Sequence, residues 1–140
     1  MEFGFVNFNK GGMVQLLHKE LSFKINGILF TVHNTVGKYA SEKQVCDLLE
    51  EAFKKEGVVY QREYFISSQH DEEKEHRHRV DFIIENKIVL EIKYRKFLQK
   101  EDYFQVKRYL HALNLALGIL VNFREERLHP KRILNGGGKV

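Results

Sequence analysis

The stretch RHRVDFIIENKIVLEIKYR, residues 77–95, constrains the fold more than any other part of the chain. It holds two runs rich in Val, Ile and Phe around a short polar break at residues 85–87, which is typical of a β-hairpin. A three-residue loop gives one wholly apolar face, made of the opposed pairs Val80–Ile92, Phe82–Leu90 and Ile84–Ile88. A two-residue loop would place apolar residues opposite charged ones, so the hydrophobic pattern selects the three-residue loop.

The same register places two carboxylates directly opposite each other. Asp81 faces Glu91 with Cβ atoms about 4.5–5.5 Å apart, a spacing at which like charges are destabilising. At about 4 Å and an effective dielectric of 20, the repulsion is roughly 4 kcal/mol. A divalent cation would reverse the sign of this energy, and Mg²⁺ commonly binds one or two carboxylates together with water and phosphate. Lys93 points to the same face, so the hairpin suits metal-assisted hydrolysis of a phosphodiester.

A second interpretation of these charges needs no metal. Charged side chains are common on an exposed sheet face, and Lys93 together with Arg79 could neutralise the two acids. A motif of this length also occurs by chance, so the hairpin alone leaves both interpretations open.

The composition limits the class of protein. A chain of 140 residues, 43% of them hydrophobic, fits one domain with an ordinary core. The net charge of +4 suits a polyanionic partner without demanding one. Cys46 is the single cysteine, which excludes an intramolecular disulfide or a multi-cysteine zinc site and favours the cytoplasm. Since no apolar run approaches membrane-spanning length and the N-terminus lacks a signal-peptide pattern, we expect no membrane partner.

Hydrophobic periodicity and capping residues predict the elements around the hairpin. Apolar spacing predicts helices over Leu16–Asn34, Ser41–Lys55 and Phe97–Asn114. Apolar runs predict strands over Val58–Ser67, Leu117–Phe123 and Lys131–Leu134. The third helix is then the usual crossover for a parallel strand pair. We expect a flexible leader at residues 1–12, a single domain at 13–134 and a flexible tail at 135–140.

Polar side chains on two of the predicted helices are candidates for function. Glu42 shares the apolar stripe of the second helix, where a carboxylate is costly unless it is paired or binds a metal. It also lies in the first turn, where the helix dipole favours a negative charge, so a structural role is equally open. Gln105, Arg108 and Tyr109 share one face of the third helix. These groups suit a phosphate backbone, although they would also be ordinary on any surface helix.

The order of these elements and motifs resembles the PD-(D/E)xK nuclease superfamily. Asp81 resembles the motif aspartate, Glu91-Ile92-Lys93 resembles the (D/E)-x-K element, and Glu42 resembles the acidic residue of the preceding helix. The segment QVKRY, residues 105–109, resembles the Gln-x-x-x-Tyr motif of the RecB-like branch. The resemblance implies an α/β fold with a restriction-endonuclease-like core, in which helices flank a mixed central sheet in the order αβββαβ.

Residues 16–134 look more closely like the small bacterial and archaeal GxxExxxR proteins. The similar segments are VHNTVG, RVDFII, IVLEIK, the helix that carries Gln105, and LGILVNF followed by KRI. The naming motif would need Gly at Tyr39 and Arg at Cys46, whereas this chain keeps only Glu42. The arginine of the relatives therefore has no counterpart at position 46, but the residues of the metal site are retained.

By this resemblance, the chain is expected to be a Mg²⁺-dependent nuclease that hydrolyses phosphodiester bonds of DNA, with Mn²⁺ able to substitute. The alternative is a catalytically silent nucleic-acid-binding or protein-interaction module on the same fold. A homodimer is compatible with either.

The resemblance also implies a role for each candidate side chain. Asp81, Glu91 and the Ile92 carbonyl would bind the metal, and Glu42 would bind a second metal or its water shell. Lys93 would orient the attacking water or stabilise the charged transition state. Gln105 and Tyr109 would position the nucleic-acid backbone. Further phosphate contacts could come from four cations that are also ordinary solvated surface residues, Lys96, Lys100, Arg108 and Arg124.

Overall fold

The computed structural model describes residues 5–8, 14–36, 39–66 and 78–140. Within them the chain forms three helices and seven strands: β1 (Phe5–Phe8), β2 (Val14–Leu16), α1 (Lys19–Val36), α2 (Glu42–Lys55), β3 (Tyr60–Phe65), β4 (Arg79–Ile84), β5 (Ile88–Lys93), α3 (Lys100–Leu113), β6 (Leu117–Asn122) and β7 (Lys131–Leu134). The predicted helices and strands are confirmed, with shifts at their ends. The first helix starts later than predicted because residues 14–16 pair with β1.

The central sheet has the order β3-β4-β5-β6-β7. In this sheet β5 and β6 are the parallel neighbours, and α3 provides the crossover between them, as the predicted helix between the two strands indicated. The other neighbours are antiparallel. The architecture is thus a mixed sheet flanked by helices, which confirms the predicted fold class.

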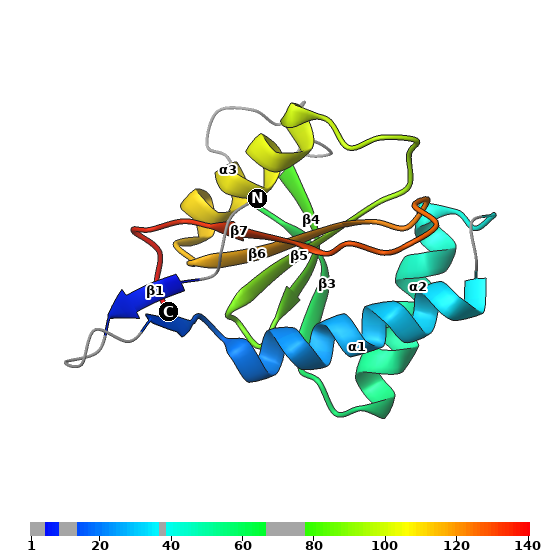
Figure 1. The fold of residues 1–140 in the computed structure, drawn as a ribbon, viewed down its shortest axis with the longest axis horizontal. Coiled ribbons are helices and arrows are strands. Elements are labelled where there is room, and N and C mark those ends of the chain that lie inside the picture. The colour runs from blue at the N-terminus through cyan, green and yellow to red at the C-terminus, as the bar shows by residue number, and fades with distance from the viewer. Residues whose placement is uncertain (1–4, 9–13, 37–38, 67–77) are drawn as a thin grey trace.

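The helices cover the sheet on both sides (Figure 1), and each side has its own core. The larger core packs α1 and α2 against side chains that include Phe82, Leu90 and Ile92. The smaller core packs α3 against residues that include Val80 and Val89. Because β6 is buried along its whole length between the two cores, its sequence is a continuous apolar run.

A capping box fixes the start of α2. The Ser41 hydroxyl accepts a hydrogen bond from the Gln44 amide at 3.1 Å, and the Gln44 side chain accepts one from the Ser41 amide at 2.9 Å. The apolar stripe then buries Val45 and Leu49 against the sheet. This arrangement holds Glu42 in the first turn of a helix that lies on the larger core.

The predicted hairpin register is confirmed for the pairs Phe82–Leu90, Ile83–Val89 and Ile84–Ile88, and the ladder ends there. Val80 does not reach the face predicted for it. It packs in the core under α3, whereas Ile92 packs in the core under α1 and α2. Across from Asp81, Glu63 has a left-handed φ of 56° and no partner in the otherwise continuous β3–β4 register. The alternation of faces therefore breaks at Asp81, in a local distortion that a strictly alternating pattern cannot predict.

The structure describes part of the predicted leader and all of the predicted tail. The leader expected at residues 1–12 includes β1, which pairs with β2, while residues 1–4 and 9–12 lie outside the described residues. Within the segment predicted as a tail, Lys139 bridges to Leu115 and donates its amide to the Asn114 carbonyl at 2.8 Å. A Cβ at Gly138 would overlap the Leu115 backbone, so glycine allows this close approach.

None of the helices in the described part of the chain is long and apolar enough to cross a membrane.

The contact between α3 and β6 depends on Gly118. A Cβ at this position would lie 2.5 Å from Cγ1 of Val106. We expect Gly118→Ala to lower the free energy of unfolding by about 1–3 kcal/mol through overpacking, as measured by urea denaturation. Val106→Ala in the same chain removes the opposing methyl groups and should recover part of the loss.

Gly27→Ala is the matched control for this substitution. Gly27 is exposed on α1, and no atom lies within 4 Å of its would-be Cβ. Alanine there should stabilise the helix by up to about 1 kcal/mol. Equal stability changes for the two glycine variants would contradict the packing account of α3 on β6.

Candidate active site

The two acids of the hairpin lie side by side where the pairing of β4 and β5 ends. The Ile92 amide donates to Asp81 Oδ2 at 2.8 Å, and the Asp81 amide donates to Glu91 Oε1 at 2.8 Å. The side chains therefore satisfy two backbone donors, each reaching across to the other strand. Asp81 is 8% exposed and Glu91 only 2% exposed, so both charges are withdrawn from water.

This burial makes ionisation of the pair costly. Burial raises the pKa of the Asp81 carboxyl to about 6, and the charge of Glu42 adds to the rise, while the Ile92 amide and Lys93 oppose it. Burial, followed by repulsion from Asp81, raises the pKa of Glu91 well above its ordinary value. A cation placed between the two carboxylates would relieve both effects.

Lys93 lies next to the acids at the end of β5. Its Nζ is 3.9 Å from Glu91 Oε2 and 4.0 Å from Asp102 Oδ1. It donates a hydrogen bond of 2.9 Å to Gln105 Oε1 on α3. The crossover helix thus holds the ammonium group in place, and the predicted neighbours Asp81, Glu91 and Lys93 are brought together.

Asp102 is a contributor to this cluster that the sequence did not single out. It is 4% exposed, accepts the Gln99 amide at 2.8 Å in the capping arrangement of α3, and lies 3.3 Å from an Arg95 nitrogen. An acid in the first turn of a helix is ordinary, so its position gave no functional signal. Its burial beside two cations shows that it also supports the Lys93 side chain.

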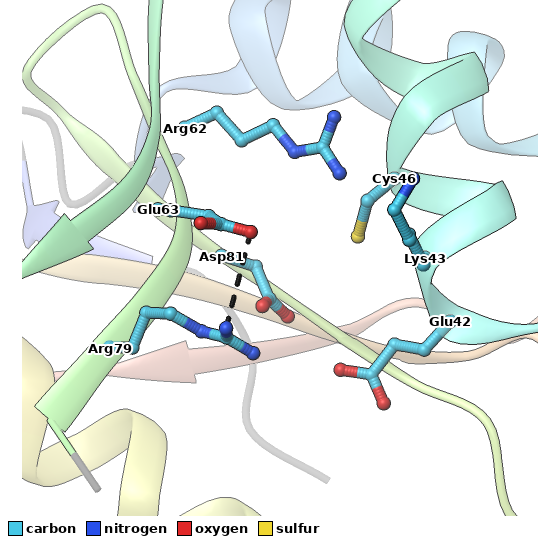
Figure 2. Close-up of a pocket in the computed structure, with 7 residues that line it drawn as sticks. All are labelled: Glu42, Lys43, Cys46, Arg62, Glu63, Arg79 and Asp81. Carbon is cyan, nitrogen blue, oxygen red and sulfur yellow. Dashed lines mark ion pairs between the residues drawn. The ribbon is translucent and has the colours of Figure 1, made fainter. Parts of the chain in front are cut away.

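Glu42 and Asp81 line one pocket of about 340 Å³, together with Lys43, Cys46, Arg62, Glu63 and Arg79. Figure 2 shows the Glu42 and Asp81 carboxylates directed into this space from α2 and β4. Arg62 is 2.7 Å from Asp47 and 3.2 Å from Glu50, so its charge is already compensated. Burial and the nearby carboxylates raise the pKa of the Cys46 thiol, which keeps it protonated and unreactive.

Most of the residues predicted to contact nucleic acid lie on α3 or just before it, and they differ in their exposure to solvent. Gln105 faces Lys93, and Tyr109 is 2% exposed with its hydroxyl donating to the Arg79 carbonyl at 3.1 Å. This hydrogen bond joins α3 to β4 two residues before Asp81. Arg108 and Lys96 are exposed, as a surface contact requires.

The donor set fits a hard divalent cation. Asp81 and Glu91 each keep a second carboxylate oxygen outside the two amide hydrogen bonds. Within the described ranges, no group of three or more His, Cys, Asp or Glu side chains is close enough to hold a metal ion. Mg²⁺ needs no such group, since it is commonly bound by one or two carboxylates with water completing the shell. Glu42 lines the pocket and raises the pKa of Asp81 without completing a three-acid cluster.

Comparison with known proteins relates most of the chain to one family. The family model described as the PD-(D/E)XK nuclease superfamily matches residues 19–133, which include every candidate site residue. No curated protein and no solved structure matches the chain.

The raised pKa of Asp81 predicts a pH-dependent stability. Well below the ordinary pKa of 3.8, the carboxyl is protonated in both folded and unfolded chains. As pH rises towards 6 only the unfolded chain loses the proton, so stability falls by up to about 3 kcal/mol and then stays low. Asp81→Asn should therefore stabilise the cation-free protein at pH 8, and Mg²⁺ should stabilise wild type but not this variant. Denaturation at pH 5 and 8, with EDTA or Mg²⁺, measures both effects.

Asp47→Asn serves as a control of opposite sign. Hydrogen bonds from Lys43 and Arg62 lower the pKa of Asp47, which lies on the surface side of α2. Removing its charge should reduce stability at pH 8 and leave the response to Mg²⁺ intact. If Asp81→Asn behaved like Asp47→Asn, the account of a strained carboxylate pair would be wrong.

Proposed function

The chain belongs to the PD-(D/E)XK nuclease superfamily, and from this membership we propose that it is a metal-dependent nuclease that hydrolyses phosphodiester bonds of DNA. Mg²⁺ is the proposed cofactor, and Mn²⁺ should replace it because both prefer oxygen ligands.

The main support for the proposal is a pair of buried carboxylates next to a lysine. Two buried carboxylates, from Asp81 and Glu91, lie together against the Lys93 ammonium group. Burying two like charges side by side is costly, and a structural role would be served as well by neutral amides. A bound cation offsets that cost and gives the arrangement a function.

Each residue then has a distinct task. The free oxygens of Asp81 and Glu91 and the Ile92 carbonyl would hold the cation, which when bound supplies Lewis-acid chemistry at the scissile phosphate. Lys93 has three N–H donors and gives one to Gln105. The other donors can orient a water molecule or neutralise charge on the phosphate. Glu42, across the pocket, would bind the water shell of the cation or a second cation.

Gln105 and Asp102 act through Lys93 as positioning residues. The hydrogen bond from Lys93 to Gln105 fixes the direction of the ammonium group, while Asp102 keeps a negative charge 4.0 Å away. Since both belong to α3, the helix that links β5 to β6 also sets the geometry of the reacting group.

A specific observation also favours the alternative, a catalytically silent nucleic-acid-binding or protein-interaction module. Asp81 and Glu91 are each hydrogen-bonded to a backbone amide, and Lys93 is bound to Gln105, so the cluster has partners within the protein. Such a cluster could persist without catalysis.

Cleavage of labelled single- and double-stranded DNA and RNA, with Mg²⁺, Mn²⁺ or EDTA, separates the two functions. We expect metal-dependent cutting of DNA that falls by at least about 100-fold in Glu91→Gln and in Lys93→Met. Glutamine keeps the shape and the hydrogen bond from the Asp81 amide, which limits any effect on folding. Lys87→Ala, a change in the exposed hairpin loop, is the matched lysine control and should cut at the wild-type rate.

Two outcomes would contradict the proposed nuclease site. A well-folded wild-type protein that binds DNA with a steep salt dependence but cuts nothing under any metal condition would identify the silent module. Cutting that persists in both site variants would place the chemistry elsewhere.

A further inference from the structure

A second cleft, of about 470 Å³, lies at the end of the sheet that carries the site. Its lining is formed by Tyr39, Ala40, Tyr94 and Arg124, and we refer to it as the aromatic cleft. Figure 1 shows the start of α2 in cyan, the connection after β5 in yellow-green and the connection after β6 in orange meeting at this end. The Ala40 amide donates to the Tyr94 hydroxyl at 2.9 Å, which fixes one wall to the other.

Hydrogen bonds tie the aromatic cleft to the strand end that bears Lys93. Asn122 pairs with Lys93 across β5 and β6 and is 1% exposed. Its side chain accepts the Arg95 amide at 3.1 Å and the Arg124 amide at 3.3 Å, and it donates to the Arg95 carbonyl at 2.7 Å. One buried amide thus holds the two connections that shape the cleft directly beyond the site.

Two aromatic rings are largely exposed to solvent, one of them in the cleft and the other on the connection between β5 and α3. Tyr39 is 89% exposed, although it lies only three residues before Glu42. Phe97 is 72% exposed, four residues after Lys93, and the Lys96 ammonium lies 5.7 Å from its ring centroid. Large aromatic rings that remain in water next to cations forgo the free energy of hydrophobic burial. A ligand that covers these rings would bury them and bind favourably.

Base stacking is the interaction that uses such rings. Single-stranded nucleic acid binds to surfaces where cations follow the backbone and aromatic side chains stack on successive bases. A duplex keeps its bases stacked on each other and presents mainly phosphates and groove edges. Exposed rings beside Arg124 and Lys96 therefore suit an unpaired strand better than a paired one.

We propose that the aromatic cleft, with Phe97, binds unpaired nucleotides and presents a single-stranded nucleic acid to the site. Tyr39 and Phe97 stack on bases, while Arg124 and Lys96 contact the backbone phosphates. The inference deepens the proposed nuclease function and rests on it only for what happens to the strand after binding.

Binding in the absence of cleavage tests this inference. In a Glu91→Gln background with EDTA, fluorescence anisotropy measures the affinity for a 12-nucleotide single strand and for the duplex of the same sequence. We expect Tyr39→Ala and Phe97→Ala each to weaken single-strand binding by roughly 5- to 100-fold and to change duplex binding less than twofold. Tyr39→Phe keeps the ring and should retain most of the affinity. Arg124→Ala should weaken both and reduce the salt dependence of binding.

Phe23→Ala is the matched control, because Phe23 is 80% exposed on α1 and belongs to neither pocket. This variant should bind both ligands as the parent protein does. Equal losses for single strand and duplex, or no loss in either aromatic variant, would overturn the inference. These results are independent of cleavage: a wild-type protein that cuts nothing refutes the proposed nuclease, whereas the binding data still decide whether the cleft takes unpaired nucleotides.

Discussion

The structure depends on two hydrogen bonds, one from the Asp81 amide to the Glu91 carboxylate and one from the Ile92 amide to the Asp81 carboxylate. Each carboxylate takes a backbone N–H group at the point where the ladder between β4 and β5 ends. The strands are thus held together by side chains where main-chain pairing has stopped, and the backbone amides remain satisfied. Val80 turns to the core under α3, and the acids are left beside a pocket instead of within a closed sheet.

The surrounding charges follow from this arrangement. Two buried acids need nearby positive charge, which Lys93 provides at 3.9 Å from Glu91. Lys93 is in turn held by Gln105 and Asp102 on α3, and Asn122 fixes the chain just after it. The site is therefore supported by the crossover helix and by both strands of the parallel pair. Because burial raises the pKa of both acids, we expect the ionised pair to reduce stability when no cation is bound.

The extent of prediction from sequence differs between elements for physical reasons. The hairpin register followed from apolar pairs such as Phe82 and Leu90, because one slipped residue would expose a whole core face. The start of α2 followed from Ser41, a good N-cap residue and therefore a local signal, and the structure adds the capping box with Gln44. Asp102 could not be recognised, since its burial depends on the packing of α3 over residues distant in sequence. The sequence also could not predict that Val80 packs under α3, because alternation assigns side chains to faces only while the strand is regular.

Similar limits apply to the candidate site. The hydrophobic pattern of the hairpin predicted that Asp81, Glu91 and Lys93 lie together. It could not show that each acid accepts a hydrogen bond from a backbone amide of the other strand. Helical spacing put Gln105 and Tyr109 on one face, yet tertiary packing buried the tyrosine against the Arg79 carbonyl. The docking of the C-terminal residues depended on the close approach of Gly138 to Leu115, which no local signal announced.

Calorimetric titration with Mn²⁺ shows whether the carboxylate pair of Asp81 and Glu91 binds a divalent cation. Because both acids have a raised pKa, we expect Mn²⁺ to bind at pH 6 with release of protons, seen as a heat that depends on the ionisation enthalpy of the buffer. Binding and proton release should both disappear in Glu91→Gln. Absence of binding to the wild-type protein, or binding that is unchanged in this variant, would mean that the carboxylate pair is not a cation site.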